Sequence, residues 1–244
     1  MRPGETTRDD SPRALELPVT QTGGGSTLKA VILDFDGVIL ESVDIKTRAF
    51  HLLFQDRPDQ IERIVQLHRD NTGLSRYEKF RIIYLDYLKK PLSEKEVSRL
   101  DRAYSNLVVA EVLSCPFVPG AQEFLAHAVG RWPLFVVSGT PHDELREIVQ
   151  LRGLGRYFHR VYGSPRSKET LLREILAENG WCSKNLVFVG DGLADLHAAD
   201  AAGIPFVGRV CKGESNPFPA SVRSIVSDLQ DLLSRWPTIV ADLS

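Results

Sequence analysis

The sequence predicts an α/β protein in which helices cover both faces of a parallel sheet and an all-helical segment is inserted near its start. Short apolar runs alternate with amphipathic helical patterns over most of the chain, and this alternation is typical of a covered parallel sheet. Residues 41–116 break the alternation, because they offer helical patterns and no convincing strand. The expected strands are Lys29–Leu33, Leu134–Val137, Arg160–Tyr162, Asn185–Val189, Pro205–Val207 and Ser224–Ser227.

The same pattern predicts how the chain is divided. A chain of 244 residues can bury one large core and carry a smaller inserted domain. We expect the core at residues 28–40 and 117–244, and the helical insert, or cap, at residues 41–116. Residues 1–27 are polar, contain prolines and end in a Gly-Gly-Gly-Ser run, so we expect a disordered tail there.

Three helical patterns support the assignment of the insert. Apolar residues recur at helical spacing in Ile61–Val65 and again in Phe80–Tyr87. Ser93–Glu96 has the Ser-x-x-Glu pattern of a capping box, which predicts a third helix that continues through Leu107. In open α/β sheets, ligands bind at the carboxyl ends of the strands. An insert placed directly after the first strand is therefore expected to cover the functional site.

Helical patterns also separate the later strands. Pro116 and Pro119-Gly120 end the insert, and Phe124–Val129 predicts the next helix. Leu145–Val149 and Leu171–Leu176 each place their apolar residues on one helical face. Strands that alternate with helices of this length indicate a parallel sheet.

Composition excludes several classes of protein. The chain has 30 Lys and Arg against 32 Asp and Glu, and this balance argues against a nucleic-acid partner. Its apolar runs are far shorter than a membrane span, and its first residues lack the apolar core of a secretory signal. The three cysteines contain no Cys-x-x-Cys pair and the histidines form no ligand pattern, so we expect a protein of the reducing cytoplasm without a zinc site.

Two aspartates, Asp34 and Asp36, directly follow the first strand. Carboxylates one residue apart repel each other and are costly to bury unless a cation or a proton compensates them. An isolated Asp-x-Asp-Gly sequence is most often an acidic turn, so the pair gains its meaning from the other strand ends.

Later segments end in residues that suit phosphate chemistry. Ser138 and Gly139 offer a hydroxyl and an unhindered amide after the second strand. Lys168 precedes an amphipathic helix, and Asp191 and Asp195 follow the fourth strand. Each feature alone has an ordinary explanation as a turn, a solvated lysine or the acidic start of a helix.

Taken in order, these motifs resemble the haloacid dehalogenase-like hydrolase superfamily. The motifs are Asp-x-Asp-Gly-Val, a strand followed by Ser-Gly, a lysine, and a strand followed by Gly-Asp-x-x-x-Asp, and the resemblance covers about residues 29–235. Val118–Gly120 and Ala202–Pro205 are also similar to this family. The position of the insert resembles the helical-cap subclass, with phosphoglycolate phosphatase-like and β-phosphoglucomutase-like members. The resemblance implies a Rossmann-like core.

The resemblance also implies roles for the acidic residues. Asp34 would be the nucleophile that forms an aspartyl-phosphate, and Asp36 would be the general acid and then the general base. The carboxylates of Asp34 and Asp191 and the backbone carbonyl of Asp36 would hold Mg²⁺, which prefers oxygen ligands. Dehalogenating members lack an acid two residues after the nucleophile, so Asp36 favours phosphoryl transfer.

By the same resemblance, Ser138, the Gly139 amide and Lys168 would bind the transferring phosphoryl oxygens. Lys168 would also screen Asp34, and Asp195 would steady either Lys168 or a metal-bound water. Many relatives have Thr-Asn where this chain has Ser138-Gly139. We expect a small effect on phosphate binding, because the hydroxyl and the amide are both retained.

Substrate choice is expected to come from the cap. Arg76 and Lys79 are three residues apart at the start of a predicted helix, so both would reach the distal anionic or hydroxyl group of a substrate. A solvated basic turn explains the pair equally well. Glu41 is interpreted as an exposed acid at a helix start, with a hinge as the alternative.

We therefore expect a Mg²⁺-dependent phosphatase of a small phosphorylated metabolite, with sugar phosphates among the candidates, in a monomer or homodimer. A phosphomutase of the β-phosphoglucomutase type is a close alternative, because it shares every core residue. A non-catalytic relative that binds a phosphorylated ligand is the alternative from another class. A dehalogenase is the least consistent enzyme.

Overall fold

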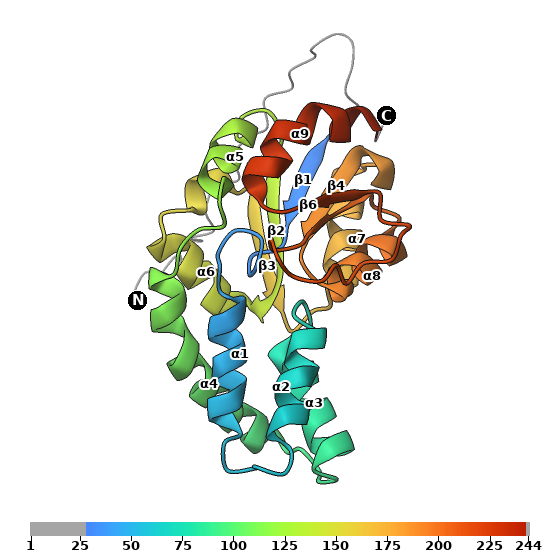
Figure 1. The fold of residues 1–244 in the computed structure, drawn as a ribbon. Coiled ribbons are helices and arrows are strands. Elements are labelled where there is room, and N and C mark those ends of the chain that lie inside the picture. Colours follow the sequence, from blue (N-terminus) through green and yellow to red (C-terminus); the bar gives the residue numbers. More distant parts are fainter. Residues whose placement is uncertain (1–27, 243–244) are drawn as a thin grey trace, which may run out of the picture.

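The computed structural model describes residues 28–242, so the tail predicted at residues 1–27 lies outside the described part of the chain. A covered sheet forms one end of the molecule, and helices α1–α4 project from the carboxyl ends of its strands (Figure 1). The elements are β1 (Ala30–Leu33), α1 (Val43–Leu53), α2 (Ile61–Asp70), α3 (Arg76–Ile82), the π-helix η1 (Ile83–Tyr87), α4 (Glu94–Ser114), α5 (Ala121–Ala128), β2 (Leu134–Pro141), α6 (His142–Leu151), the 3₁₀ helix η2 (Gly155–Tyr157), β3 (Arg160–Ser164), α7 (Lys168–Asn179), the 3₁₀ helix η3 (Ser183–Asn185), β4 (Leu186–Gly190), α8 (Leu193–Ala202), β5 (Phe206–Arg209), β6 (Ser224–Val226) and α9 (Leu229–Asp242).

The sheet confirms the predicted fold class. Its six described strands are all parallel and run in the order β3-β2-β1-β4-β5-β6. Every predicted strand is present, and β2 continues beyond its predicted end as far as Pro141. The strand order reverses between β1 and β4, and this is the place where open α/β sheets bind their ligands. β1 is buried along its whole length because helices cover both faces.

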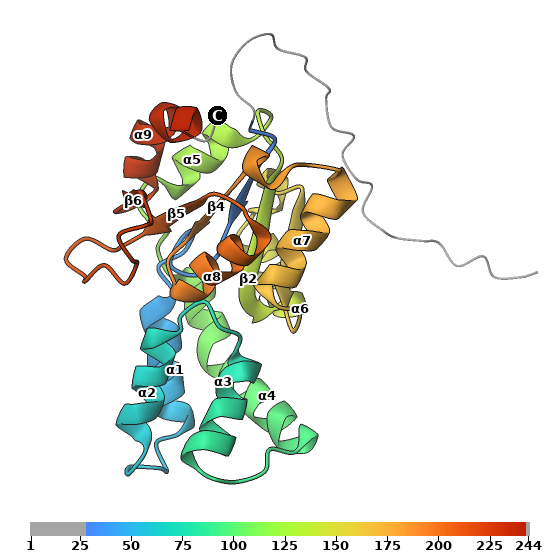
Figure 2. The ribbon, with the colours of Figure 1, turned by 90° about the vertical axis from the view of Figure 1, so that its right-hand side faces the viewer.

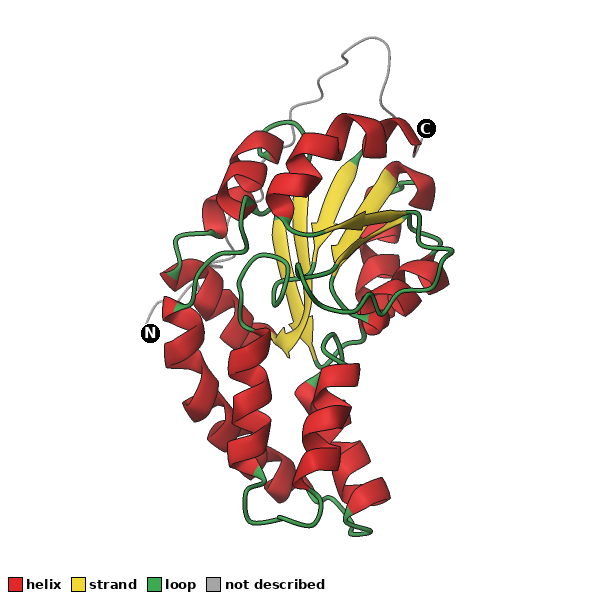
Figure 3. Ribbon diagram, in the orientation of Figure 1, coloured by secondary structure: helices red, strands yellow, loops and turns green. Residues whose placement is uncertain are grey.

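Alternate side chains of β1 pack into two separate apolar layers. Val31 and Leu33 join the layer that contains buried residues of α5, α6 and α9, whereas Ala30 and Ile32 join the layer under α7 and α8. The side that carries α7 and α8 faces the viewer in Figure 2, and Figure 3 shows the strands between these two groups of helices. The helix predicted at Phe124–Val129 ends one residue early, and the side chain of Val129 is 40% exposed.

The cap helices enclose an aromatic cluster of their own. Phe50 of α1 lies 4.9 Å from the ring of Tyr104 and 6.0 Å from that of Phe80, centroid to centroid. The apolar face predicted at Phe80–Tyr87 continues from α3 into η1.

The predicted capping box is only half formed. The Ser93 hydroxyl accepts the Glu96 amide at 3.3 Å, as expected. The Glu96 carboxylate instead accepts hydrogen bonds from Arg99 and from the Tyr84 hydroxyl. A guanidinium one helical turn away is the stronger donor, which explains why the reciprocal contact is not made.

The two connections between the sheet and the cap helices run side by side. The Glu41 amide donates to the Pro116 carbonyl at 3.0 Å, and the Val118 amide donates to the Ile39 carbonyl at 3.0 Å. Leu40 and Phe117 form an antiparallel bridge between these two bonds. We propose that the cap begins and ends at this bridge.

Candidate active site

Asp34 lies at the carboxyl end of β1, at the centre of the sheet. Its amide donates to the Val189 carbonyl of β4 at 2.9 Å, which continues the strand pairing to this residue. Its carboxylate is buried, with 2% of the residue exposed, and accepts a hydrogen bond from the Phe35 amide at 2.6 Å. The end of the central strand therefore fixes Asp34 at the switch point of the sheet.

Lys168 lies between two of the predicted acids. Its ammonium is 2.8 Å from Asp34 Oδ2 and 2.5 Å from Asp195 Oδ1, and all three side chains are buried. The other oxygen of Asp195 accepts the Gly192 amide at 3.1 Å. A Cβ on Gly190 would lie 2.4 Å from the Asp195 Cβ, so only glycine permits this approach. Asp195 thus holds Lys168 against Asp34.

Asp191 completes an acidic cluster. Asp34, Asp191 and Asp195 each place a carboxylate oxygen within 4.8 Å of the others. Asp191 Oδ1 is buried and has no hydrogen-bond partner among the described residues. A Cβ on Gly37 would lie 2.2 Å from Asp191 Oδ2, so Asp191 packs directly on the backbone that follows Asp36.

Burial and mutual repulsion destabilise the charges of this cluster. Burial raises the pKa of Asp34 to about 7; Lys168 opposes this shift, and Asp195 and Asp36 add to it. Burial and the charge of Asp34 raise the pKa of Asp191 well above its usual range. A divalent cation would relieve both effects, and the oxygen-only donor set with one unpartnered oxygen fits Mg²⁺.

Asp36 faces the cap and a second set of polar groups. Its carboxylate forms an ion pair with Lys46 of α1 and accepts hydrogen bonds from Ser42 at 2.6 Å, Thr140 at 2.8 Å and Ser138 at 3.4 Å. Burial raises the pKa of Asp36, but the charge of Lys46 and the hydrogen bonds outweigh it and hold the value at about 2.

Sequence reasoning missed three of these partners: Lys46, Ser42 and Thr140. Thr140 could have been predicted from the sequence, because it lies two residues after Ser138 on β2 and side chains two apart share a face of a strand. Lys46 and Ser42 could have been found from their place beside the Asp-x-Asp turn, but their contact with Asp36 depends on how α1 leaves the sheet.

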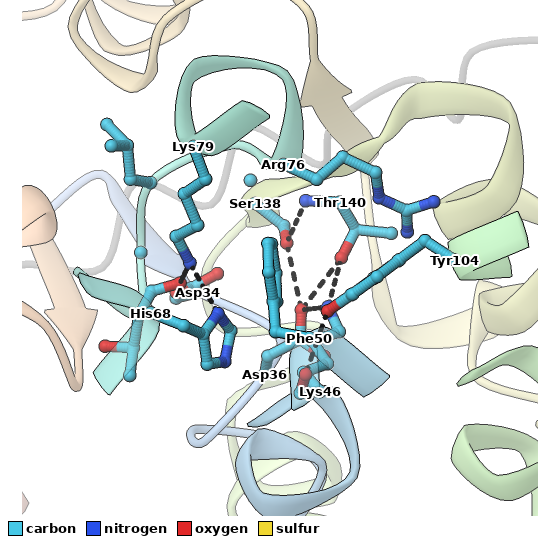
Figure 4. A pocket seen from close by; sticks show the side chains of 14 residues that line it. Asp34, Asp36, Lys46, Phe50, His68, Arg76, Lys79, Tyr104, Ser138 and Thr140 are labelled. Atoms are coloured by element: carbon cyan, nitrogen blue, oxygen red, sulfur yellow. Dashed lines mark hydrogen bonds and ion pairs between the residues drawn. The ribbon is translucent and has the colours of Figure 1, made fainter. Parts of the chain in front are cut away.

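The loop before α3 closes over the acids. A Cβ on Gly139 would lie 2.9 Å from the Gly73 carbonyl oxygen, and a Cβ on Gly73 would lie 3.3 Å from Lys168 Nζ. Two glycines therefore let the cap backbone approach both the β2 loop and the charged cluster. A small cavity of about 20 Å³ remains between cap and sheet (Figure 4).

Lys79 reaches this cavity from α3. It is 2% exposed, and its ammonium lies 3.0 Å from His68 Nδ1 and 3.5 Å from the Thr72 carbonyl. Burial lowers the pKa of Lys79 to about 7, and the nearby cations Lys46 and Lys168 lower it further. An anionic ligand would stabilise its charged form.

Arg76 also lines the cavity, but its charge is already compensated. Its guanidinium pairs with Glu144 of α6 and with Asp101 of α4 at 3.1 Å. The sequence predicts either a guanidinium directed at a substrate or a solvated basic turn, whereas Arg76 is buried and paired. The structure differs because Glu144 comes from the core, and the sequence does not show which core helix the cap contacts.

Glu41 is paired rather than free. Its carboxylate binds Arg209, at the end of β5, with contacts of 2.6 and 3.3 Å. Arg209 is 6% exposed and also donates to the Gly37 carbonyl at 3.2 Å. The pair therefore supports both the turn after Asp36 and the first connection to the cap, and it lines a larger cavity of about 520 Å³ that also reaches Asp191.

Comparison with known proteins identifies the family. The model of haloacid dehalogenase-like hydrolases matches residues 28–203. The chain belongs to this family. It is therefore a hydrolase, and the helical cap agrees with the subclass that the sequence resembles. No helix among residues 28–242 is long and apolar enough to cross a membrane.

Three similar proteins illustrate the range of relatives. A 5'-nucleotidase of Pseudomonas aeruginosa is 32% identical over 95 residues, which are 36% of this chain and 43% of that protein. A phosphoglycolate phosphatase of Aliivibrio fischeri is 27% identical over 212 residues, which are 82% of this chain and 92% of that protein. The crystal structure of β-phosphoglucomutase from Clostridium difficile has a TM-score of 0.68 at 18% identity, covers 88% of this chain and 97% of its own, and establishes the shared fold.

Proposed function

We propose that the chain is a Mg²⁺-dependent phosphatase that hydrolyses a small phosphorylated metabolite through an aspartyl-phosphate on Asp34. The observation that carries this proposal is the buried cluster at the switch point, where Lys168 joins Asp34 to Asp195 beside the unpartnered oxygen of Asp191. The phosphatases among the curated relatives support the same class of reaction.

The first step forms a bond between a carboxylate oxygen of Asp34 and phosphorus, and it breaks the bond from phosphorus to the substrate oxygen. Lys168 and the hydroxyl of Ser138 would balance the charge of the phosphoryl oxygens, together with the amide of Gly139. Asp36 would give its proton to the leaving oxygen. In the second step water attacks phosphorus, Asp36 takes up the water proton, and the bond from phosphorus to the Asp34 oxygen breaks, which restores the Asp34 carboxylate and releases inorganic phosphate.

The surroundings of Asp36 suit the second step. With Lys46 against it, Asp36 is ionised at neutral pH and ready to accept a proton. The first step needs Asp36 to be protonated, and protonation becomes more favourable when Lys46 moves away. Because Lys46 belongs to the cap helix α1, we propose that cap movement changes the proton affinity of Asp36 between the two steps.

Mg²⁺ would be held by the carboxylates of Asp34 and Asp191 and by the Asp36 carbonyl. When bound, it would neutralise the repulsion among the acids and withdraw charge from the transferring group. Asp195 would remain outside this set and would instead hold Lys168 in place, with its other oxygen bound to the Gly192 amide.

The direct test is release of inorganic phosphate from p-nitrophenyl phosphate and from a panel of phosphorylated metabolites, with Mg²⁺ or with EDTA. Asp34→Asn should abolish release, whereas Glu147→Gln, an exposed acid on α6, should retain it. Activity that survives Asp34→Asn would exclude the nucleophile. Isomerisation of a sugar phosphate faster than phosphate release would favour a phosphomutase instead.

A further inference from the structure

The Arg76 end of the active-site cavity is built from both parts of the molecule. Arg76 is 5% exposed, and its guanidinium stacks on the ring of Tyr104, with 4.4 Å between the guanidinium carbon and the ring centroid. Glu144 accepts hydrogen bonds from both terminal nitrogens of Arg76, one of them at 3.1 Å, and a further one from Ser105 at 2.5 Å. Asp101 adds a second carboxylate at 3.1 Å. Two carboxylates thus face one guanidinium.

The other cations in and beside the cavity divide into two kinds. Lys46 lines the cavity and is paired with Asp36, and Lys168, beside it, is paired with Asp34 and Asp195. Lys79 is the one cavity cation of the described chain without a carboxylate contact. Figure 4 shows Lys79 on the same side of the pocket as Asp34, and the Arg76 guanidinium on the opposite side. An uncompensated positive charge is therefore absent from the Arg76 side in the residues that line this cavity.

We propose that Glu144 determines specificity by neutralising Arg76, so that the enzyme accepts monophosphates and rejects substrates that carry a second anionic group at their far end. This inference rests on the proposed phosphatase function and adds a substrate class to it. Glu144 acts through Arg76 and is a positioning residue.

The physical reason is competition for one guanidinium. A second phosphoryl group at the Arg76 end would have to displace Glu144, which is largely buried and would keep only the Ser105 hydroxyl as a partner. Leaving a buried carboxylate unpaired is strongly unfavourable, and the incoming group would also meet the charge of Asp101. Substrates with a second phosphoryl group are therefore rejected because Glu144 already occupies the guanidinium that this group would need.

The same argument separates phosphatase from phosphomutase. A mutase that moves a phosphoryl group between two hydroxyls of a phosphorylated sugar passes through a bisphosphate, with an anionic group at each end. Such an enzyme needs an uncompensated cation at the end remote from the nucleophile. In this chain the remote guanidinium is matched by Glu144 and Asp101.

The test uses pairs of alkanediol monophosphates and bisphosphates of three to six carbons, with kcat and KM measured for each in Mg²⁺. For the wild type we expect kcat/KM to be at least tenfold lower for the bisphosphate that spans the pocket than for its monophosphate. Glu144→Gln should reduce this ratio about tenfold, mainly through KM for the bisphosphate. Glu144→Asp should retain the discrimination because it keeps the charge, and the exposed Glu147→Gln should behave as the wild type.

Asp101→Asn provides a second route if Glu144→Gln fails to fold. It removes the other, more exposed carboxylate from Arg76 and should shift the ratio in the same direction by a smaller factor. Equal kcat/KM for both members of every pair in the wild type would overturn the inference, and so would a Glu144→Gln variant in which both members change equally. Absence of phosphate release from every substrate, including p-nitrophenyl phosphate, would instead refute the proposed function.

Discussion

Replacing Asp34 by asparagine should change how the stability of the metal-free protein depends on pH. Burial raises the pKa of Asp34 from its ordinary value of 3.8 to about 7, so the native state binds this proton more tightly than the unfolded state does. The stabilisation is fully present below about pH 4 and is lost as the pH rises towards 7. At 1.36 kcal/mol per pH unit, the loss amounts to about 4 kcal/mol.

Asparagine has no proton to lose, so the variant lacks this contribution at every pH. The free energy of unfolding of the wild type minus that of Asp34→Asn should therefore be about 4 kcal/mol lower at pH 7.5 than at pH 4. The variant also removes a charge beside Asp191, whose pKa is raised partly by Asp34. This relief acts in the same direction. Groups that titrate equally in both proteins cancel in the comparison.

The assay is urea unfolding of both proteins in EDTA at the two pH values. Repeating the series in saturating Mg²⁺ gives the control, because a cation bound by the acids should remove most of the pH dependence. A stability difference that stays constant between pH 4 and 7.5, or that grows in favour of the wild type, would refute the account of Asp34 as a destabilised buried acid.

Three further outcomes follow from the site. Lys46→Met should raise the pKa of Asp36. The acidic limb of the pH profile of kcat should then move up by about 1–3 pH units with acetyl phosphate, a substrate whose leaving group needs no proton. An unchanged limb would mean that Lys46 does not control the pKa of Asp36. Gly37→Ala should abolish Mg²⁺-dependent activity because its Cβ would lie 2.2 Å from Asp191, whereas Gly130→Ala, with a similar positive φ and open space, should cost only about 1–2 kcal/mol of stability. Mg²⁺ at about 100 times its dissociation constant should raise the free energy of unfolding by about 2.7 kcal/mol at pH 7.5, and calorimetry should detect no such gain in Asp191→Asn.

The sheet and the acidic motifs could be predicted from the sequence because each depends on a short local pattern. A buried parallel strand is a short apolar run, and the residues that follow it lie at one edge of the sheet whatever the rest of the chain does. Asp34, Lys168, Asp191 and Asp195 therefore came together as the order of the motifs indicated.

The charged partners of Asp36 and Arg76 could not be predicted from the sequence in the same way. Arg76 and Glu144 are 68 positions apart, on the cap and on a core helix, and their contact depends on how these two parts dock. Lys46 reaches Asp36 for the same reason. The pattern of a basic residue on a helix start gives the charge but not its partner, and the partner decides whether that charge is available to a substrate.

The paired connections at Leu40 and Phe117 have a consequence for how the molecule tolerates change. Because the chain departs from the sheet and returns to it within one hydrogen-bonded bridge, the helices between these points close a loop whose ends are already joined. Lengthening, shortening or exchanging those helices would leave the distance between the ends the same, and the strands would not need to shift. The cap is in this sense a replaceable module, so the same active site can act on different substrates while the sheet that positions it stays unchanged.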